Sequence, residues 1–217
     1  MQNKPKYVVG MYENNVDFIP DLIDGDYDIP VIEPEEYVET KWISFREAGE
    51  RKYMRGEFGV HFFIDDYVFQ RLWNMREKYK GMLMDYSAVM TPDFSIFTDW
   101  PVPVQIWNHY RKHLLGAWMQ SLGCKVYPTI SWSDESSYKW CFDGEPRCAT
   151  VCVSSVGTQM NKETKRLFLS GYERMMEELD PETILFYGQI PPECTGNIVP
   201  IKPFQERLRM VKKHDCD

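Results

Sequence analysis

Short apolar segments rich in Val, Ile and Phe recur along this chain, and each ends abruptly in small or acidic residues. The clearest cover residues 60–64, 88–90, 126–130, 149–153 and 184–186. A helical pattern fills most of the gaps between them. This alternation is typical of parallel β/α units, in which binding and catalytic side chains gather at the carboxyl ends of the strands. The pattern therefore predicts where a site lies, but not what the site does.

The chain has 217 residues, a length that favours one compact α/β domain. We assign residues 1–28, which are polar and rich in turn signals, to an N-terminal arm, and residues 29–217 to a single α/β domain. Residues 29–32 resemble a first strand that ends at Glu33. About seven strands are expected. A full barrel has eight βα units and typically needs roughly 250 residues, so eight such units would be tight in this chain. We expect mostly parallel strands with intervening helices in a small or incomplete TIM-barrel-like fold, with an open doubly wound sheet as the alternative.

Two helices are well marked. Residues 101–122 begin with prolines, which suit a first helical turn, and are followed by Gly123, which suits the position after a helix end. Residues 162–179 follow Asn161, a candidate N-cap. Asp66 is a candidate N-cap for a third helix.

Composition narrows the classes of function. The formal net charge of −8 weakens the case for nucleic-acid binding, although a metal-dependent nuclease can be acidic overall. No run of residues is long and apolar enough to span a membrane. The six cysteines form no Cys-x-x-Cys pair, and the first residues contain no apolar signal core. We therefore expect a cytoplasmic protein with reduced thiols.

Several segments together resemble one family. They are residues 58–67, the Pro92-Asp93-Phe94-Ser95 loop, residues 105–111 and residues 130–134. They are similar to the uncharacterised family called domain of unknown function 4417 (DUF4417), which is found in bacteria, phages and mobile elements. The resemblance covers about residues 30–200. It implies a phage or mobile-element protein in a bacterial host cell, and it implies no activity.

Acidic residues form the first candidate site. Five of them fall at or just beyond predicted strand ends: Glu33, Asp65, Asp66, Asp93 and Asp134. Converging carboxylates could bind a divalent metal ion, of unknown identity, or could act as a general acid and base. The simpler alternative is that each Asp only caps a helix.

Small and polar residues form two further candidates. The turn that contains Ser154, Ser155 and Gly157 could hold an anion on its backbone N–H groups, although it lacks the lysine of a phosphate-binding loop and could be an ordinary turn. A second group lies around the start of the long helix and after the strand at residues 125–131. It could orient a polar ligand, and it contains Ser95, Asp99, Gln105, Asn108, Arg111, Ser131 and Trp132. Arg111 could instead form a structural ion pair.

The histidines are weaker candidates. His109 and His113 are four residues apart on the long helix, a spacing that can bind a metal ion, but they lie off the apolar stripe. We therefore expect both to be exposed and not to be ligands. We expect His61 to be a core residue.

Three functions remain open. The first is a hydrolase or lyase that acts on a phosphorylated or nucleotide-like small molecule, with Asp65, Asp66 and Asp93 as catalytic residues. The second is a non-catalytic accessory protein that binds a host or phage protein through Trp42, Trp100, Trp132 and Trp140. The third is metal-dependent processing of nucleic acid at the same acidic residues.

Overall fold

The computed structural model describes residues 7–50 and 55–201, and its main feature is a series of seven parallel strands in chain order. The first four form one sheet: β3 (Lys41–Ser44), β4 (Phe58–His61), β5 (Ala88–Met90) and β6 (Val126–Tyr127). The last three form another: β7 (Thr150–Ser154), β8 (Thr183–Tyr187) and β9 (Ile198–Ile201). A parallel bridge from Thr129 to Cys152 links the two sheets.

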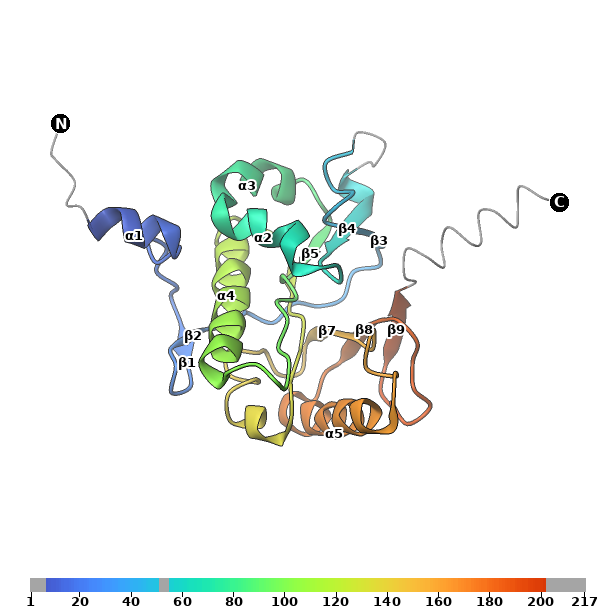
Figure 1. The fold of residues 1–217 in the computed structure, drawn as a ribbon. Helices are drawn as coiled ribbons and strands as arrows, with labels where there is room; N and C mark the ends of the chain where they lie inside the picture. Colours follow the sequence, from blue (N-terminus) through green and yellow to red (C-terminus); the bar gives the residue numbers. More distant parts are fainter. Residues whose placement is uncertain (1–6, 51–54, 202–217) are drawn as a thin grey trace, which may run out of the picture.

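Helices occupy most of the connections between these strands. The helical elements are α1 (Tyr7–Glu13), η1 (Arg55–Glu57), α2 (Asp66–Asn74), α3 (Arg76–Met84), α4 (Val102–Ser121), η2 (Glu135–Lys139) and α5 (Lys162–Leu179). In Figure 1, α4 stands on one side of the molecule and α5 runs below β7–β9.

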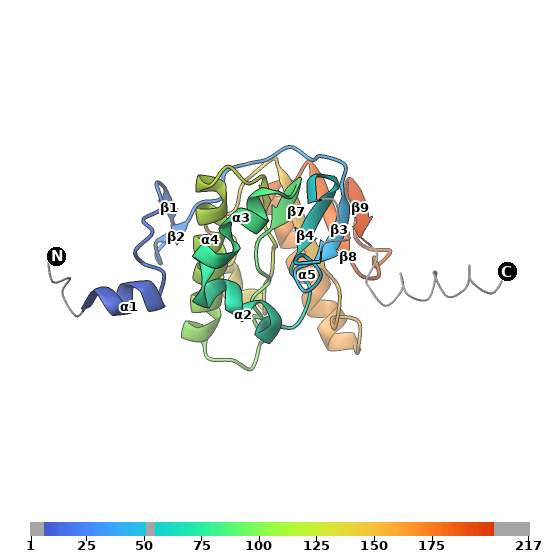
Figure 2. The same cartoon turned by 90° about the horizontal axis from the view of Figure 1, so that it is seen from above.

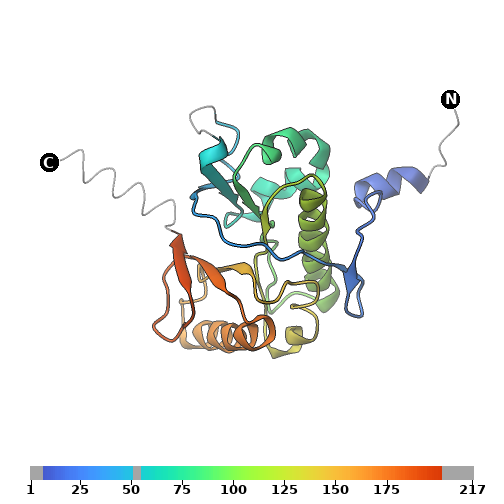
Figure 3. The same ribbon diagram turned by 180° about the vertical axis from the view of Figure 1, so that it is seen from behind.

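The strand order distinguishes between the two expected architectures. A doubly wound sheet reverses its strand order at a switch point. Here the order follows the chain from β3 to β9 without reversal, as in a barrel. Figure 3 shows the two groups of strands one above the other. Among the described residues β9 does not pair with β3, so the barrel is not closed. The expected parallel α/β fold is confirmed, in its incomplete form.

The core has two parts, and strand alternation divides residues between them. On β8, Leu185 and Tyr187 face the first part, which fills the space between the two sheets. Ile184 and Phe186 face the second part, where β7 and β8 pack against α5. This period of two is expected of a strand with both faces covered.

The expected strand at residues 29–32 is not the first strand of the parallel series. Only β2 (Ile29–Pro30) is extended there, and it pairs antiparallel with β1 (Ile23–Asp24). Pro30 has no N–H to donate to a ladder, and Pro34 follows four residues later. The first parallel strand is β3; for this segment the residue pattern alone indicates a loop or a short strand. For residues 46–53 the pattern predicts a short helix, but residues 45–49 form turns, so the described part of that segment is not helical.

The N-terminal arm forms α1 and the first strand of this hairpin, and both α1 and the hairpin lie at the edge of the molecule in Figure 2. The hairpin is attached through Gly144, whose N–H donates to Asp24 and whose carbonyl accepts from Ile32. Gly144 has a positive φ of 73°. A Cβ atom there would lie 2.7 Å from the carbonyl oxygen of Pro30 and 2.9 Å from Nδ1 of His113.

We expect Gly144→Ala to lower the free energy of unfolding by about 2–4 kcal/mol, because it adds a collision to the strain of a positive φ. Gly123→Ala is the matched control. Gly123 also has a positive φ, of 84°, but a Cβ atom there meets open space. It should cost only the strain, about 1–2 kcal/mol. Urea denaturation of both variants measures the difference, and equal losses would show that the close contact at Gly144 is absent.

The two well-marked helices are confirmed. Asn161 caps α5 in a capping box with Thr164, and Gly123 follows α4 with a positive φ. The sequence also predicts a terminal helix from about residue 204; this segment, with Cys216, lies outside the described residues. The other five cysteines are free thiols, four of them buried. No helix among the described residues has the length and apolar character to cross a membrane.

Candidate functional site

A large hollow opens at the carboxyl ends of the parallel strands and has a volume of about 950 Å³; we call it the mouth cavity. Its wall includes the last residue of four strands: Ser44, His61, Ser154 and Tyr187. The cavity therefore lies where parallel β/α folds place their sites.

Carboxylates from separate loops line the mouth cavity: Glu47, Asp65, Asp66 and Asp93. Asp66 is the first residue of α2, and its side chain does not cap that helix. Its carboxylate instead accepts hydrogen bonds from the N–H (3.0 Å) and Oγ (2.9 Å) of Ser95, in the loop after β5. The interpretation of Asp66 as a simple N-cap is therefore wrong, and this residue joins two strand-end loops.

Asp93 has the most perturbed carboxyl of the cavity. Burial, together with the negative charge of Asp66, raises the pKa of Asp93 to about 7, and Lys112 opposes the shift. No described residue makes a hydrogen bond to its side chain. A carboxyl with a pKa near neutrality can both give and take a proton at physiological pH.

A second, smaller hollow adjoins the mouth cavity and has a volume of about 290 Å³; we call it the side cavity. Both hollows share Asp93, Phe97, Ser154 and Val156 as wall residues. Apolar residues in the wall of the side cavity are Ile130, Trp132, Leu167 and Phe168. Ser131 also lines it, and its Oγ finds no partner in the described part of the chain. Asp93 thus lies where the mouth cavity, which is lined by carboxylates, meets a second cavity with aromatic side chains in its wall.

Three of the predicted ligand residues hold the loop after β5 and do not line either cavity. Asn108 donates to the carbonyl of Ser95 (2.7 Å), and Arg111 donates to Oδ1 of Asn108 (2.6 Å). The Arg111 guanidinium lies 3.9 Å from the ring centre of Phe94. Gln105 donates to the carbonyl of Trp100 (2.8 Å) at the other end of the loop. Among the described residues Arg111 forms no ion pair, so the alternative that it pairs with an acidic residue is not observed.

Other predicted residues lie away from the acidic group. Glu33 follows the hairpin, and its N–H donates to Gln120 at the far end of α4. Asp134 accepts from the N–H of Ser136 and caps η2, as in the simpler interpretation. Asp99 is exposed and borders neither cavity. Glu33 follows a strand of the antiparallel hairpin and not one of the parallel series. Asp99 and Asp134 follow β5 and β6, but several residues beyond the strand ends.

The predicted anion-binding turn lies at the junction of the two cavities, where Ser154 and Gly157 line the walls. Ser155 is buried, and its Oγ donates to the carbonyl of Gln189 (2.6 Å). The N–H of Val156 donates to Ser154 Oγ, and Asn161 caps α5. Few N–H groups therefore remain for an anion.

The sequence patterns missed part of the wall. His61 is buried as expected, yet it lines the mouth cavity with Phe63 and Tyr187, whose ring centres lie 5.0 Å apart. Glu47 accepts from the N–H and Oγ of Ser44. For Ser44 and Tyr187, the sequence signal that could have identified them as wall residues was their position at the ends of strands.

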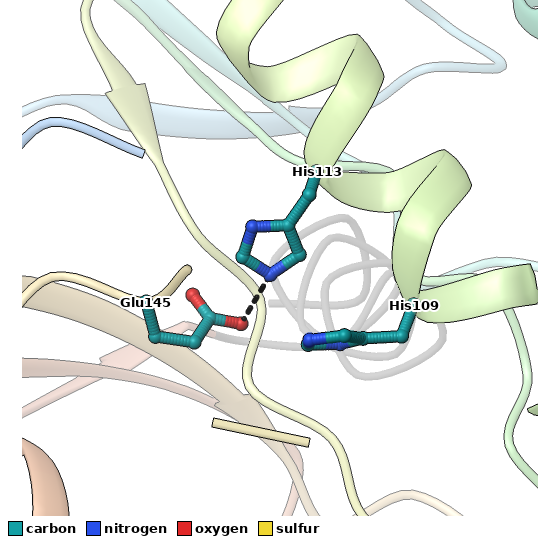
Figure 4. Close-up of side chains that lie close together, drawn as sticks. All are labelled: His109, His113 and Glu145. Atoms are coloured by element: carbon teal, nitrogen blue, oxygen red, sulfur yellow. Dashed lines mark hydrogen bonds and ion pairs between the residues drawn. The ribbon is translucent and has the colours of Figure 1, made fainter. Parts of the chain in front are cut away.

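His109 and His113 are fully buried, so the expectation that they are exposed is wrong. The α4 side that carries His109, Lys112 and His113 is covered by the hairpin and by residues 143–145. Within the described residues, His109, His113 and Glu145 are also the group whose ligand atoms come close enough to hold a metal ion, within 4.8 Å of one another (Figure 4). The carboxylates of the mouth do not form such a group.

A comparison with known proteins agrees with this residue pattern. The family model described as domain of unknown function (DUF4417) matches residues 22–205. The chain belongs to this family. Two curated relatives are each called "Gene 1 protein", from Mycobacterium phage L5 and Mycobacterium phage D29. Both are 35% identical to this chain over 165 residues, which is 76% of the chain. That stretch is 72% of the L5 protein and 61% of the D29 protein.

No solved structure matches this DUF4417 chain, so its geometry is the source of functional inference. The mouth cavity combines carboxylates, one of them with a pKa near neutrality, with aromatic walls from Phe63, Phe97 and Tyr187. Acid–base chemistry on a polar molecule with a flat ring is what such an arrangement can perform.

Proposed function

We propose that this phage-type protein is a hydrolase or lyase that cleaves the bond between a flat ring and a sugar-like group, as in a nucleoside. The observation that carries the proposal is the position of Asp93, whose pKa is about 7, on the wall that the acidic mouth cavity and the side cavity share. A ring seated in the side cavity and a hydroxyl-rich group in the mouth cavity bring the connecting bond to this carboxyl.

The residues then have separate roles. Asp93 gives its proton to the departing ring. Asp66, fixed by Ser95, keeps the pKa of Asp93 high by its negative charge. In a hydrolase, Asp65, which also lines the mouth cavity, takes the proton of the attacking water. Trp132 and Phe168 provide the ring contact in the side cavity.

Charge favours a substrate without a phosphate group. Among the described residues that line the mouth cavity, four carry carboxylates and Arg46 is the cation. A phosphate would meet repulsion there. The turn at Ser154–Gly157 offers few N–H groups to offset it. The phosphorylated substrates that the sequence suggested are therefore disfavoured relative to neutral ones.

The test is turnover of eight unphosphorylated ribo- and deoxyribonucleosides and their 5′-monophosphates, followed as release of the free base by liquid chromatography. We expect turnover of at least one neutral nucleoside, with a pH profile that inflects near 7. Asp93→Asn should lower its rate by about 10²–10⁴-fold. Asp99→Asn, an exposed acid of the same loop, should not. Absence of turnover, or equal rates in wild type and Asp93→Asn, would refute the proposal.

A second candidate is binding to a host or phage protein. It is favoured by exposed apolar side chains on the arm, among them Ile19 (81% exposed), Leu22 and Ile23. Trp42 and Trp140, which the sequence suggested as contacts, are buried in the core, whereas Trp100 and Trp132 are partly exposed. Crosslinking in infected cells, with Ile19→Ser and Leu22→Ser as a paired change, tests this candidate through loss of a specific adduct.

Metal-dependent processing of nucleic acid receives less support. The described carboxylates of the mouth do not converge as metal ligands, and the described wall contributes one cation to contact a phosphate backbone.

A further inference from the structure

The buried polar group on α4 is separate from the mouth cavity. His109 and His113 lie one turn apart, and both are completely inaccessible to solvent. Their rings lie close, with centres 4.4 Å apart. Glu145, from the segment before β7, faces them across the space that Figure 4 shows.

Backbone carbonyls fix which ring nitrogens carry hydrogen. A carbonyl oxygen only accepts, so the ring nitrogen facing it must donate. Nδ1 of His113 lies 2.8 Å from the carbonyl oxygen of Pro30, and Nε2 of His109 lies 3.0 Å from that of Asp143. In the neutral rings, Nε2 of His113 and Nδ1 of His109 therefore carry lone pairs. Histidines that bind metals are usually held in this way by their second nitrogen.

The lone-pair nitrogens lack suitable partners. Nδ1 of His109 is buried and has no hydrogen-bond partner among the described residues. Nε2 of His113 faces Oε1 of Glu145 at 3.0 Å, where a lone pair would meet a carboxylate oxygen. Oε2 of Glu145 is likewise buried without a partner in the described chain. Each orphaned buried polar atom costs about 1–3 kcal/mol. One cation in the middle would satisfy all three residues.

We propose that His109, His113 and Glu145 bind one zinc ion, through Nδ1, Nε2 and a carboxylate oxygen respectively. Two imidazoles and a carboxylate form a ligand set that zinc commonly takes in proteins. The candidate ligand atoms lie within 4.8 Å of one another. Tetrahedral zinc needs ligands separated by about 3.4 Å, so small side-chain rotations complete the site.

Lys112 limits the geometry of the site. Its Nζ donates to Oε1 of Glu145 (2.5 Å) and to the carbonyl of Thr129 (2.8 Å). The metal ion therefore takes the unpartnered Oε2, and the carboxylate bridges zinc and Lys112. The positive charge of Lys112 lowers the affinity below that of an uncompensated site.

The site would tie together three segments that are distant in sequence. Pro30 belongs to the hairpin, the histidines to α4, and Asp143 and Glu145 to the segment before β7. Because every ligand is buried, zinc would enter as the chain folds and would stabilise the folded state by its binding free energy.

The experiment uses variants that remove a ligand atom but keep the hydrogen bond of the ring. Gln places an N–H near the position of Nε2, so His109→Gln can still donate to Asp143. Asn places one near Nδ1, so His113→Asn can still donate to Pro30. Cys148→Ser controls for adventitious zinc on an exposed thiol. Each untagged full-length protein is unfolded with a chelator, refolded with zinc, desalted and analysed for metal by mass spectrometry.

We expect about one zinc ion per chain in wild type and in Cys148→Ser, and less than about a tenth of that in the two histidine variants. Zinc should raise the melting temperature of wild type and not that of the folded variants. Refolding with cobalt should give the visible bands of a tetrahedral site in wild type, a readout that does not depend on the variants folding. Zinc content below about a tenth in wild type, or equal zinc in wild type and either histidine variant, would overturn the proposal.

Discussion

Asp93→Asn is expected to make the protein more stable at pH 8 and to leave its stability nearly unchanged at pH 4. In the folded chain, burial and the charge of Asp66 raise the pKa of Asp93 from its ordinary value of 3.8 to about 7. The folded state therefore holds this proton in a pH range where the unfolded chain has lost it. Stability falls as pH rises from about 4, and the full cost is present above about pH 7.

The size of the effect follows from the shift. Each pKa unit corresponds to about 1.4 kcal/mol, so a shift of about three units sets an upper bound of roughly 4 kcal/mol. An amide of the same shape carries no charge and avoids this cost. Urea denaturation of wild type and variant at both pH values measures the difference. Asp99→Asn, which changes an exposed acid of the same loop, should show no such pH-dependent gain. Destabilisation by Asp93→Asn at pH 8 would contradict a raised pKa.

A stabilising substitution at this position has a functional meaning. A carboxyl that lowers stability at neutral pH is retained when its chemistry is needed, and active sites commonly carry such costs. Combined with the turnover test, the variant separates two explanations. If Asp93→Asn gains stability and loses turnover, Asp93 is a catalytic residue. If the variant gains stability and keeps its turnover, the Asp93 carboxyl is needed neither for stability nor for catalysis.

Local sequence signals predicted the parts of this fold that depend on neighbours in the chain. Caps and flanking prolines or glycines located α4 and α5, because those signals act within one helical turn. Apolar segments that end in acids located β4 and β5. The loops that follow them place Asp65, Asp66 and Asp93 on one cavity wall.

The sequence could not predict what distant segments cover. His109 and His113 lie off the apolar stripe of α4, a pattern that indicates exposure. They are buried because Pro30 and Glu145, many residues away, pack over that side of the helix. Glu33 follows an apolar segment like the others, but that segment pairs in a hairpin and not in the parallel series. The burial of the two histidines and the position of Glu33 both depend on tertiary packing.

Lys112→Met is expected to lower the free energy of unfolding by about 3–5 kcal/mol in chelator-treated protein. Lys112 is 1% exposed, and its ammonium contacts Glu145, whose side chain is fully buried. Methionine retains most of the side-chain volume but leaves the carboxylate with a charge that water cannot reach. The attraction of Lys112 holds the pKa of Glu145 below its ordinary value, against burial. Losing Lys112 should therefore raise this pKa.

A double-mutant cycle isolates the pair. Glu145→Gln alone strands the ammonium of Lys112, whereas Lys112→Met with Glu145→Gln leaves neither charge buried. The double variant should lose less stability than the sum of the single losses, with a coupling of about 1–3 kcal/mol. Arg166→Met is the matched control, because Arg166 pairs with Glu135 and Glu163 at the surface, where an ion pair contributes at most about 1 kcal/mol. A loss in Lys112→Met as small as that in Arg166→Met would show that the buried charges are not paired. A large coupling energy would instead show that Lys112 and Glu145 form a charged pair in the protein interior. Such a pair would explain why the polar side of α4 packs inward.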